Sequence, residues 1–188
     1  MKFGIVMKSN KEPMELAYMN VTSTLSSKYT FDNFTVNESN RFAYKVAFEV
    51  AEGRGNNYFP LYLFGESGVG KTHLLHSIGN HALSLNESYR VVYLTTKGFI
   101  RELTKHIIKN HNTVFTDSFR DVDILLLDDV NDFSGRTYPQ DHLFHIYDLL
   151  LYSGKTLVVA SNKPPMKISQ LENRIVTCLI GGIIAEIQ

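Results

Sequence analysis

The amino-acid sequence predicts an α/β domain built on a parallel sheet that helices cover on both faces. Short apolar segments alternate along the chain with longer segments of helical periodicity. Most of the short segments are apolar at every position, which is typical of strands buried on both faces. The composition, 44% hydrophobic and 12% aromatic over 188 residues, is that of one globular domain and excludes a disordered chain.

The elements follow one another from about residue 29 onward. Residues 1–28 show no lasting period, and we expect a poorly structured leader or tether there, with at most a short strand at 3–7. The core, residues 29–188, begins with an amphipathic helix at 41–51 that ends near Gly53. Strands are then expected at 61–64, 91–94, 124–127, 156–160 and 183–185, and helices at 72–85, 99–110 and 140–152.

Charge and cysteine usage narrow the class of protein. The 19 Lys and Arg residues balance 19 Asp and Glu residues, so no global basic field favours non-specific nucleic-acid binding. The single cysteine, Cys178, excludes an internal disulfide and fits a reducing compartment. No apolar run approaches the roughly 18 residues of a membrane span. We therefore expect a cytoplasmic protein with no membrane span.

A glycine-rich loop between the first strand and the second helix carries the strongest chemical signal. Its sequence satisfies G-x-x-x-x-G-K-[ST] in the strand-to-helix context that phosphate binding requires. Backbone NH groups at the glycines and the helix start would cradle phosphates, with the lysine on the β- and γ-phosphates and the threonine hydroxyl on Mg²⁺. The predicted site consists of Gly65, Glu66, Ser67, Gly68, Val69, Gly70, Lys71 and Thr72.

Two carboxylates follow the buried strand at 124–127. Asp128 would stand at the carboxyl end of that strand, where open α/β sheets bind ligands, and is predicted to hold Mg²⁺ directly or through water. Asp129 would orient or deprotonate the attacking water. The alternative for both residues is an ordinary strand-end residue that caps the next segment.

A polar side chain also follows the strand at 156–160. Asn162 is predicted to hydrogen-bond the γ-phosphate or the attacking water, since this strand would lie between the nucleotide strand and the acidic strand. The alternative is an Asx turn that introduces Pro164. Lys71, Asp129 and Asn162 are thus the catalytic candidates.

Taken together, several segments resemble the AAA+ ATPase domain of the bacterial replication initiator DnaA, in the same order and spacing. They are residues 29–34 (YTFDNF), 39–43 (SNRFA), 68–74 (GVGKTHL), 91–94 (VVYL), 122–129 (VDILLLDD), 164–165 (PP) and 171–174 (LENR). The resemblance implies ATP or ADP and Mg²⁺ as ligands, and a five-stranded parallel sheet of order 5-1-4-3-2. It also implies an adenine pocket near Phe34 and Val36 with help from Asn40, and a role in DNA replication initiation or its control.

The departures from that family matter as well. The position of Arg174 is followed in the family, four residues later, by a second arginine that reaches the ATP of a neighbouring subunit, and this sequence has Cys178 there. A thiol supplies neither the fixed charge nor the forked donors of a guanidinium. The sequence ends at Gln188, where the family continues into a helical lid and a DNA-binding domain, so we expect a core that lacks the lid.

A basic stripe lies on the predicted helix at 99–110. Arg101, Lys105 and Lys109 recur every four residues, where the resemblance implies contacts with single-stranded DNA. Arg136 retains a basic position of the family, whereas a second one has become Tyr138. A solvated charged face explains the stripe equally well.

The sequence therefore predicts an ATP-binding core of a DnaA-like initiator or initiator paralogue that hydrolyses ATP slowly at most. Replication proteins or other DnaA-like subunits would be its partners. The alternative is a nucleotide-binding adaptor or helicase-loader-like module in which the nucleotide is a structural ligand. A P-loop kinase of a small metabolite is disfavoured, because the sequence offers no arginine-rich lid.

Overall fold

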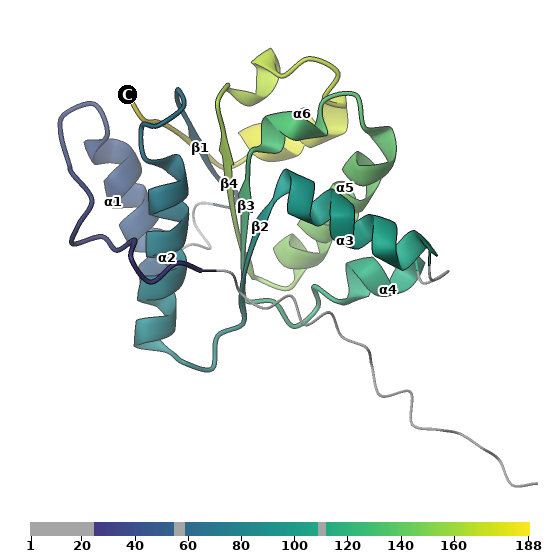
Figure 1. The fold of residues 1–188 in the computed structure, drawn as a ribbon, viewed down its shortest axis with the longest axis horizontal. Helices are drawn as coiled ribbons and strands as arrows, with labels where there is room; N and C mark the ends of the chain where they lie inside the picture. The colour runs from purple at the N-terminus through teal and green to yellow at the C-terminus, as the bar shows by residue number, and fades with distance from the viewer. Residues whose placement is uncertain (1–24, 55–58, 109–111) are drawn as a thin grey trace, which may run out of the picture.

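The computed structural model describes residues 25–54, 59–108 and 112–188 (Figure 1). The strand expected at 3–7 lies outside the described residues. The strands are β1 (Leu61–Phe64), β2 (Val91–Thr95), β3 (Ile124–Asp128), β4 (Thr156–Ser161) and β5 (Ile183–Glu186). The helices are α1 (Arg41–Glu49), α2 (Lys71–Leu85), α3 (Thr96–Ile108), α4 (Asn112–Asp117), α5 (Thr137–Tyr152) and α6 (Asn173–Ile180), with a π-helical turn at Val50–Arg54 and 3₁₀ turns at Val130–Phe133 and Pro165–Lys167.

The five strands form one sheet in the order β2-β3-β4-β1-β5, and each neighbouring pair is parallel. This order confirms the predicted 5-1-4-3-2, read from the other edge of the sheet. The register pairs Phe64 with Ser161 and Thr95 with Asp128, so the carboxyl ends of the strands meet at one edge. The loops that leave these ends are therefore neighbours.

Helices cover both faces of the sheet, as Figure 1 shows: α1 and α2 lie on one face and α3 to α6 on the other. Along β1, β2, β3 and β4, successive side chains enter different cores, as the pleat requires. On β1, for example, Leu61 and Leu63 join the core under α1 and α2, while Tyr62 joins the core under α3, α5 and α6. Burial on both sides explains why the inner positions of these four strands are apolar, whereas the edge strand β5 exposes Ile184 and Glu186.

Several boundaries differ from the prediction, and two helices were missed. Helix α5 begins at Thr137 rather than residue 140, because Pro139 lies in the first turn, where its missing NH group has no partner to lose. Helix α4 falls in a segment for which the sequence predicted no structure. Helix α6 was also missed, although Ile175 and Leu179 are buried at the i, i+4 spacing of a helix.

Residues 25–28, assigned to the leader from the sequence, contact α2 in the structure. The backbone NH of Ser26 donates to Nδ1 of His76 at 3.3 Å, and Nδ2 of Asn80 donates to the carbonyl oxygens of Ser26 and Tyr29 at 2.9 and 2.7 Å. The ring of Tyr29 stacks on that of His76, with 5.4 Å between centroids. This strap, residues 25–29, fixes the start of the described chain against α2.

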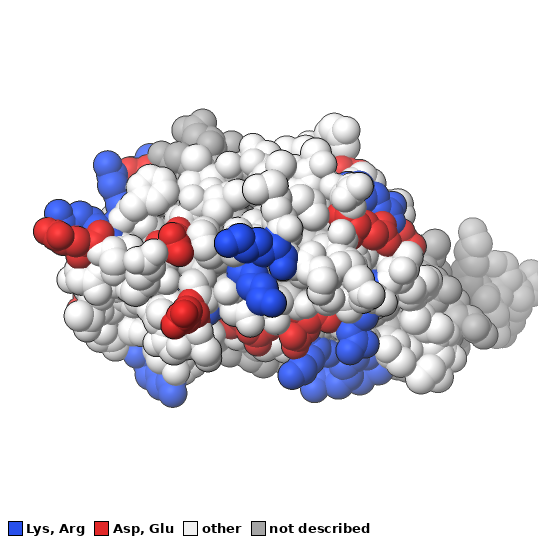
Figure 2. Space-filling model, turned by 90° about the horizontal axis from the view of Figure 1, so that it is seen from above, with Lys and Arg blue, Asp and Glu red and all other residues white. Residues whose placement is uncertain are grey.

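Within the described part of the chain, no helix is both long and apolar enough to cross a membrane. Figure 2, seen from above relative to Figure 1, shows small groups of basic and acidic residues scattered among uncharged ones. The face in view thus carries no extended field of one sign, in agreement with the balanced composition.

Candidate functional site

The glycine-rich loop leaves β1 and turns directly into α2. Gly68 and Gly70 adopt φ values of +87° and +105°, a conformation that side-chain-bearing residues rarely adopt and that turns successive NH groups toward a common centre. The backbone at Gly70 also lies close to the Phe34 ring, because a Cβ atom at residue 70 would stand 2.7 Å from Cε2 of Phe34. The loop therefore needs glycine for its conformation and, at residue 70, for space.

Lys71 begins α2 and folds back over the loop that precedes it. Its Nζ donates to the carbonyl oxygens of Gly65 at 2.7 Å and Glu66 at 2.5 Å. Burial lowers the pKa of the Lys71 ammonium, and the carboxylates of Asp128 and Asp129 oppose that shift. A cation thus lies inside the glycine-rich loop, residues 65–70, close to Asp128 at the end of β3 and to Asp129 directly after it.

Thr72 and Asp128 lie together as the sequence predicts for a metal site. The Thr72 hydroxyl donates to Oδ2 of Asp128 at 2.7 Å, and Oδ1 of Asp128 accepts the backbone NH of Asp129 at 3.0 Å. Asp128 is only 3% exposed, so its carboxylate is held at the edge of the sheet rather than in solvent.

A tyrosine that the sequence analysis missed completes the surroundings of Asp128. The hydroxyl of Tyr93, on β2, donates to Oδ2 of Asp128 at 3.1 Å. Burial raises the pKa of this hydroxyl well above its ordinary value, and the neighbouring Asp128 carboxylate adds to the effect, so the group stays a donor. The sequence feature that could have revealed Tyr93 is the alternation of side chains along β2. This alternation puts Tyr93 and Asp128 on the same face of adjacent strands.

Asp129 is exposed and holds an unusual backbone conformation. Its φ of +58° is uncommon for a residue with a side chain, and such strain is concentrated at functional sites. Although Asp129 is exposed, partial loss of hydration raises the pKa of its carboxyl, and the charges of Asp128 and Asp132 raise it further. The alternative of a capping residue finds no support in Asp129, whose side chain makes no cap hydrogen bond to the following 3₁₀ turn.

Asn162 directly follows β4 and is exposed at the same edge of the sheet. Its backbone NH and the hydroxyl of Ser161 both donate to Oδ1 of Asn131, each at 3.3 Å. The hydrogen bond that turns the chain before Pro164 runs from the NH of Lys163 to the hydroxyl of Ser161. Asn131, which the sequence analysis also missed, thereby ties the end of β4 to the turn after β3.

The candidate adenine residues lie on the segment between the strap and α1. Phe34 packs against Gly70 of the loop and makes an edge contact with the His73 ring, 5.1 Å between centroids. Val36 is 42% exposed. Asn40 is buried, accepts the NH of Asn37 at 2.9 Å and donates to the Thr35 carbonyl at 3.0 Å, so its side chain holds this segment in shape.

The basic residues singled out from the sequence are largely engaged within the chain. Arg101 and Lys105 both pair with Glu102, and Nε of Arg136 donates to the Asp132 carbonyl at 3.0 Å. Lys109 lies outside the described residues. The stripe is therefore less positive than its lysines and arginines alone indicate.

The segment that carries Arg174 and Cys178 makes its contacts within the chain. Arg174 pairs with Asp141 on α5 and with Glu172, and its guanidinium lies 5.0 Å from the centroid of the Phe144 ring. Cys178, one turn further along α6, is partly buried, and burial raises the pKa of its thiol.

The donor set fits a magnesium ion bound together with phosphates. Thr72 and Asp128 supply oxygen ligands, the type that Mg²⁺ prefers, and a hydroxyl that donates its one proton to Asp128 keeps its oxygen lone pairs for a cation. Among the described residues, no group of three or more His, Cys, Asp or Glu side chains could hold a metal alone. Phosphate oxygens and water would have to complete the coordination, as is usual for Mg²⁺.

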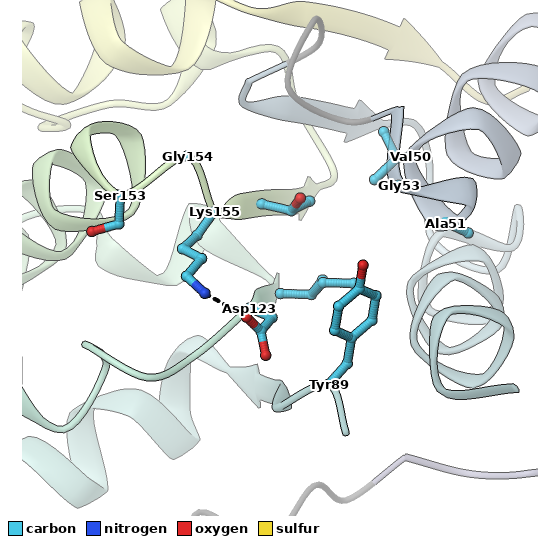
Figure 3. A pocket seen from close by; sticks show the side chains of 10 residues that line it. Val50, Ala51, Gly53, Tyr89, Asp123, Ser153, Gly154 and Lys155 are labelled. Atoms are coloured by element: carbon cyan, nitrogen blue, oxygen red, sulfur yellow. Dashed lines mark hydrogen bonds and ion pairs between the residues drawn. The ribbon is translucent and has the colours of Figure 1, made fainter. Parts of the chain in front are cut away.

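A pocket of about 260 Å³ opens near the start of β3 and β4, at the opposite edge of the sheet (Figure 3). Val50, Ala51 and Tyr89 contribute its apolar lining, and Lys155 reaches across to Asp123, with 2.5 Å between Nζ and Oδ1. None of the residues predicted to bind a nucleotide lines this pocket.

The fold and the loop together define a P-loop protein of the AAA+ type. The bacterial DnaA ATPase domain family matches residues 25–186 of this chain. Domain III of DnaA from Thermotoga maritima is 38% identical, with a TM-score of 0.85 over 88% of this chain and 69% of that one. AMPPCP-bound DnaA from Aquifex aeolicus is also 38% identical, with a TM-score of 0.84 over 88% of this chain and 52% of that one.

This chain belongs to the bacterial DnaA ATPase domain family. It spans about half the length of several of the DnaA structures that it matches. The helicase loader DnaC shares the fold at 17% identity, with a TM-score of 0.74 over 86% of this chain and 98% of that one.

Proposed function

We propose that this chain binds ATP with Mg²⁺ and serves as the ATP-binding core of a DnaA-like replication initiator or initiator paralogue. The observation that carries the proposal is the phosphate cradle, in which Lys71 lies beside the Thr72–Asp128 pair. A related DnaA has been solved with AMPPCP, a nucleotide that resembles ATP. The proposed role is in DNA replication initiation or its regulation.

The residues of the cradle would divide the work of binding. Bound ATP would bring the phosphate chain, and Mg²⁺ would supply positive charge to balance it. Lys71 would exchange the carbonyls of Gly65 and Glu66 for phosphate oxygens, since an ammonium bonds more strongly to an anion than to neutral acceptors. Thr72 and Asp128 would hold the metal ion. Phe34 and Val36 would contact the adenine, with Asn40 keeping their segment in place.

Asp129 and Asn162 would act on the attacking water. Both follow strands that end at the same edge of the sheet, and both are exposed there. The raised pKa of Asp129 makes this carboxylate a better proton acceptor than an ordinary aspartate. Asn162 would orient the water or the γ-phosphate, its backbone being held by Asn131.

A pH profile of ATP hydrolysis tests the role of Asp129. A base works only when deprotonated, so the rate should rise with pH through the pKa of Asp129, which lies above its ordinary value. We expect Asp129→Asn to lower the single-turnover rate by about 100-fold or more and to remove this acidic limb. If the rate of the variant still rises with pH over the same acidic range, another group is the base.

We expect slow hydrolysis by the isolated chain. Cys178 replaces the finger arginine of the family, so charge that develops on the γ-phosphate lacks a cationic partner from a neighbouring subunit. Arg174, one turn earlier, is engaged with Asp141 and Glu172. Steady-state phosphate release should stay below about 1 s⁻¹, the lower end of dedicated phosphoryl-transfer enzymes. Faster turnover would contradict this part of the proposal.

A second candidate is an adaptor or helicase-loader-like module whose nucleotide has a structural role. The same replacement at Cys178 favours it, because assembly driven by ATP would lose its finger. Such a module would bind ATP and ADP equally well and engage its protein partners in both states. Sedimentation of the chain with ATP and with ADP distinguishes the two candidate functions. The oligomeric state of an initiator-like core should differ between the nucleotides, whereas that of an adaptor should be the same.

Single-stranded DNA is a further proposed ligand, since a related DnaA has been solved with AMPPCP and single-stranded DNA. Arg101, Lys105, Lys109 and Arg136 are the candidate contacts in this chain. Because Glu102 pairs with both Arg101 and Lys105, we expect weak binding that falls steeply with salt. Replication proteins or other DnaA-like subunits are the proposed protein partners.

A further inference from the structure

We propose that Tyr93 is a positioning residue of the magnesium site, where its hydroxyl holds the carboxylate of Asp128 in the orientation that receives the ion. The inference rests on the proposed function, since it assigns Asp128 to Mg²⁺. Tyr93 would not touch the ion or the nucleotide. It would act only through Asp128.

The sheet register places the two side chains within reach. Tyr93 pairs with Leu126 on the neighbouring strand, and Asp128 stands two residues further along β3 on the same face. Two residues along a strand advance the chain by about 6.6 Å. A long side chain that leans along β2 can cover this offset, and the Tyr93 hydroxyl ends 3.1 Å from Oδ2 of Asp128.

Three donors then fix the carboxylate. Oδ2 accepts the hydroxyls of Thr72 and Tyr93, and Oδ1 accepts the NH of Asp129. Thr72 would itself contact the ion, and the NH of Asp129 belongs to the strained turn after β3. Tyr93 is the donor that comes from a regular strand, so its position does not depend on the loop or on the nucleotide.

The ring of Tyr93 is locked in turn by α2. Its centroid lies 4.2 Å from that of the His76 ring, which is buried and accepts the backbone NH of Ser26. Tyr93 is itself only 9% exposed. A rigid support of this kind, outside the ligands of an ion, typically contributes 10- to 100-fold to metal affinity.

Tyr93→Phe tests the assignment with a change of one oxygen atom. The ring contacts remain and one hydrogen bond is lost, so the variant should fold. We expect nucleotide affinity in EDTA to stay within twofold of the wild type. The Mg²⁺ concentration that gives half-maximal enhancement of ATP binding should rise about tenfold or more. A purely structural role of Tyr93 would not separate these two measurements.

Tyr62→Phe is the matched control. Tyr62 is also buried, and its hydroxyl donates to the Lys163 carbonyl at 2.7 Å, away from Asp128. Removing that hydroxyl should leave the Mg²⁺ midpoint unchanged. In an Asp128→Asn background, Tyr93→Phe should shift the midpoint by less than twofold, because the two residues act as one unit.

The outcomes distinguish this inference from the proposed function. If the wild type binds ATP equally well with Mg²⁺ and with EDTA, the proposed function loses its metal site. If the wild type depends on Mg²⁺ and Tyr93→Phe has the same midpoint, the role of Tyr93 is wrong while the metal site stands. If Tyr93→Phe shifts the Mg²⁺ midpoint equally in the Asp128→Asn background, the proposed role of Tyr93 is also wrong.

Discussion

Lys71→Ala should lower the affinity of the chain for ATP by about 100-fold or more, which corresponds to about 3 kcal/mol. The ammonium lies inside the glycine-rich loop and donates to the carbonyls of Gly65 and Glu66, and a phosphate oxygen is a stronger acceptor than either. The loss should therefore fall on nucleotide binding. Competition against a fluorescent ATP analogue measures it.

The stability of the unliganded variant is the accompanying test. Burial lowers the pKa of Lys71, so the folded chain holds this charge at a disadvantage. Removing the ammonium also removes its hydrogen bonds to the Gly65 and Glu66 carbonyls. Because these two effects oppose each other, we expect the melting temperature to stay almost unchanged. Lys45→Ala, on the exposed surface of α1, removes the same charge and serves as the control. Equal ATP affinity in the two variants would contradict the assignment of Lys71.

Gly65→Ala should be among the most destabilising single changes in the described core. A Cβ at residue 65 would lie 2.0 Å from the carbonyl oxygen of Ile187 and 3.1 Å from Cγ2 of Val69. The contact with Ile187 is to backbone that follows β5 and bonds back to Phe64, so it cannot move aside as a flexible side chain would. We expect a loss of about 3 kcal/mol, at the upper end for overpacking.

Comparing the melting temperatures of Gly65→Ala and Gly53→Ala separates the steric clash at residue 65 from the general cost of replacing a glycine. Gly53 adopts φ +79°, and a Cβ there would meet no atom within 4 Å. Gly53→Ala should therefore cost about 1 kcal/mol of backbone strain and lower the melting temperature by about 3 °C. Gly65→Ala should lower it by about 10 °C. Equal melting temperatures would mean that the end of β5 yields easily.

The sequence predicted the elements that carry a strong local pattern. All five strands of the described sheet and the helix after the glycine-rich loop were found. Burial on both faces makes β1 to β4 apolar over most of their length. The glycine-rich loop was equally clear as a connection from strand to helix, while its binding of phosphate stays a prediction. Lys71, Thr72 and Asp128 are indeed brought together.

What escaped prediction depends on partners distant in sequence. Tyr93 reads as an ordinary strand residue until the register of β2 and β3 places it beside Asp128. Asn131 and Ser161 likewise meet only because β3 and β4 are neighbours. The engagement of Arg174 with Asp141 depends on how α6 packs on α5, which no local pattern encodes.

The most direct test of the account is a titration of the purified chain with a fluorescent ATP analogue and Mg²⁺, competed by ATP, ADP and GTP. We predict saturable binding that adenine nucleotides displace, that GTP displaces poorly, and that Lys71→Ala lacks. Binding by the Lys71→Ala variant, or none by the wild type, would contradict the claim that this cradle is a working ATP site.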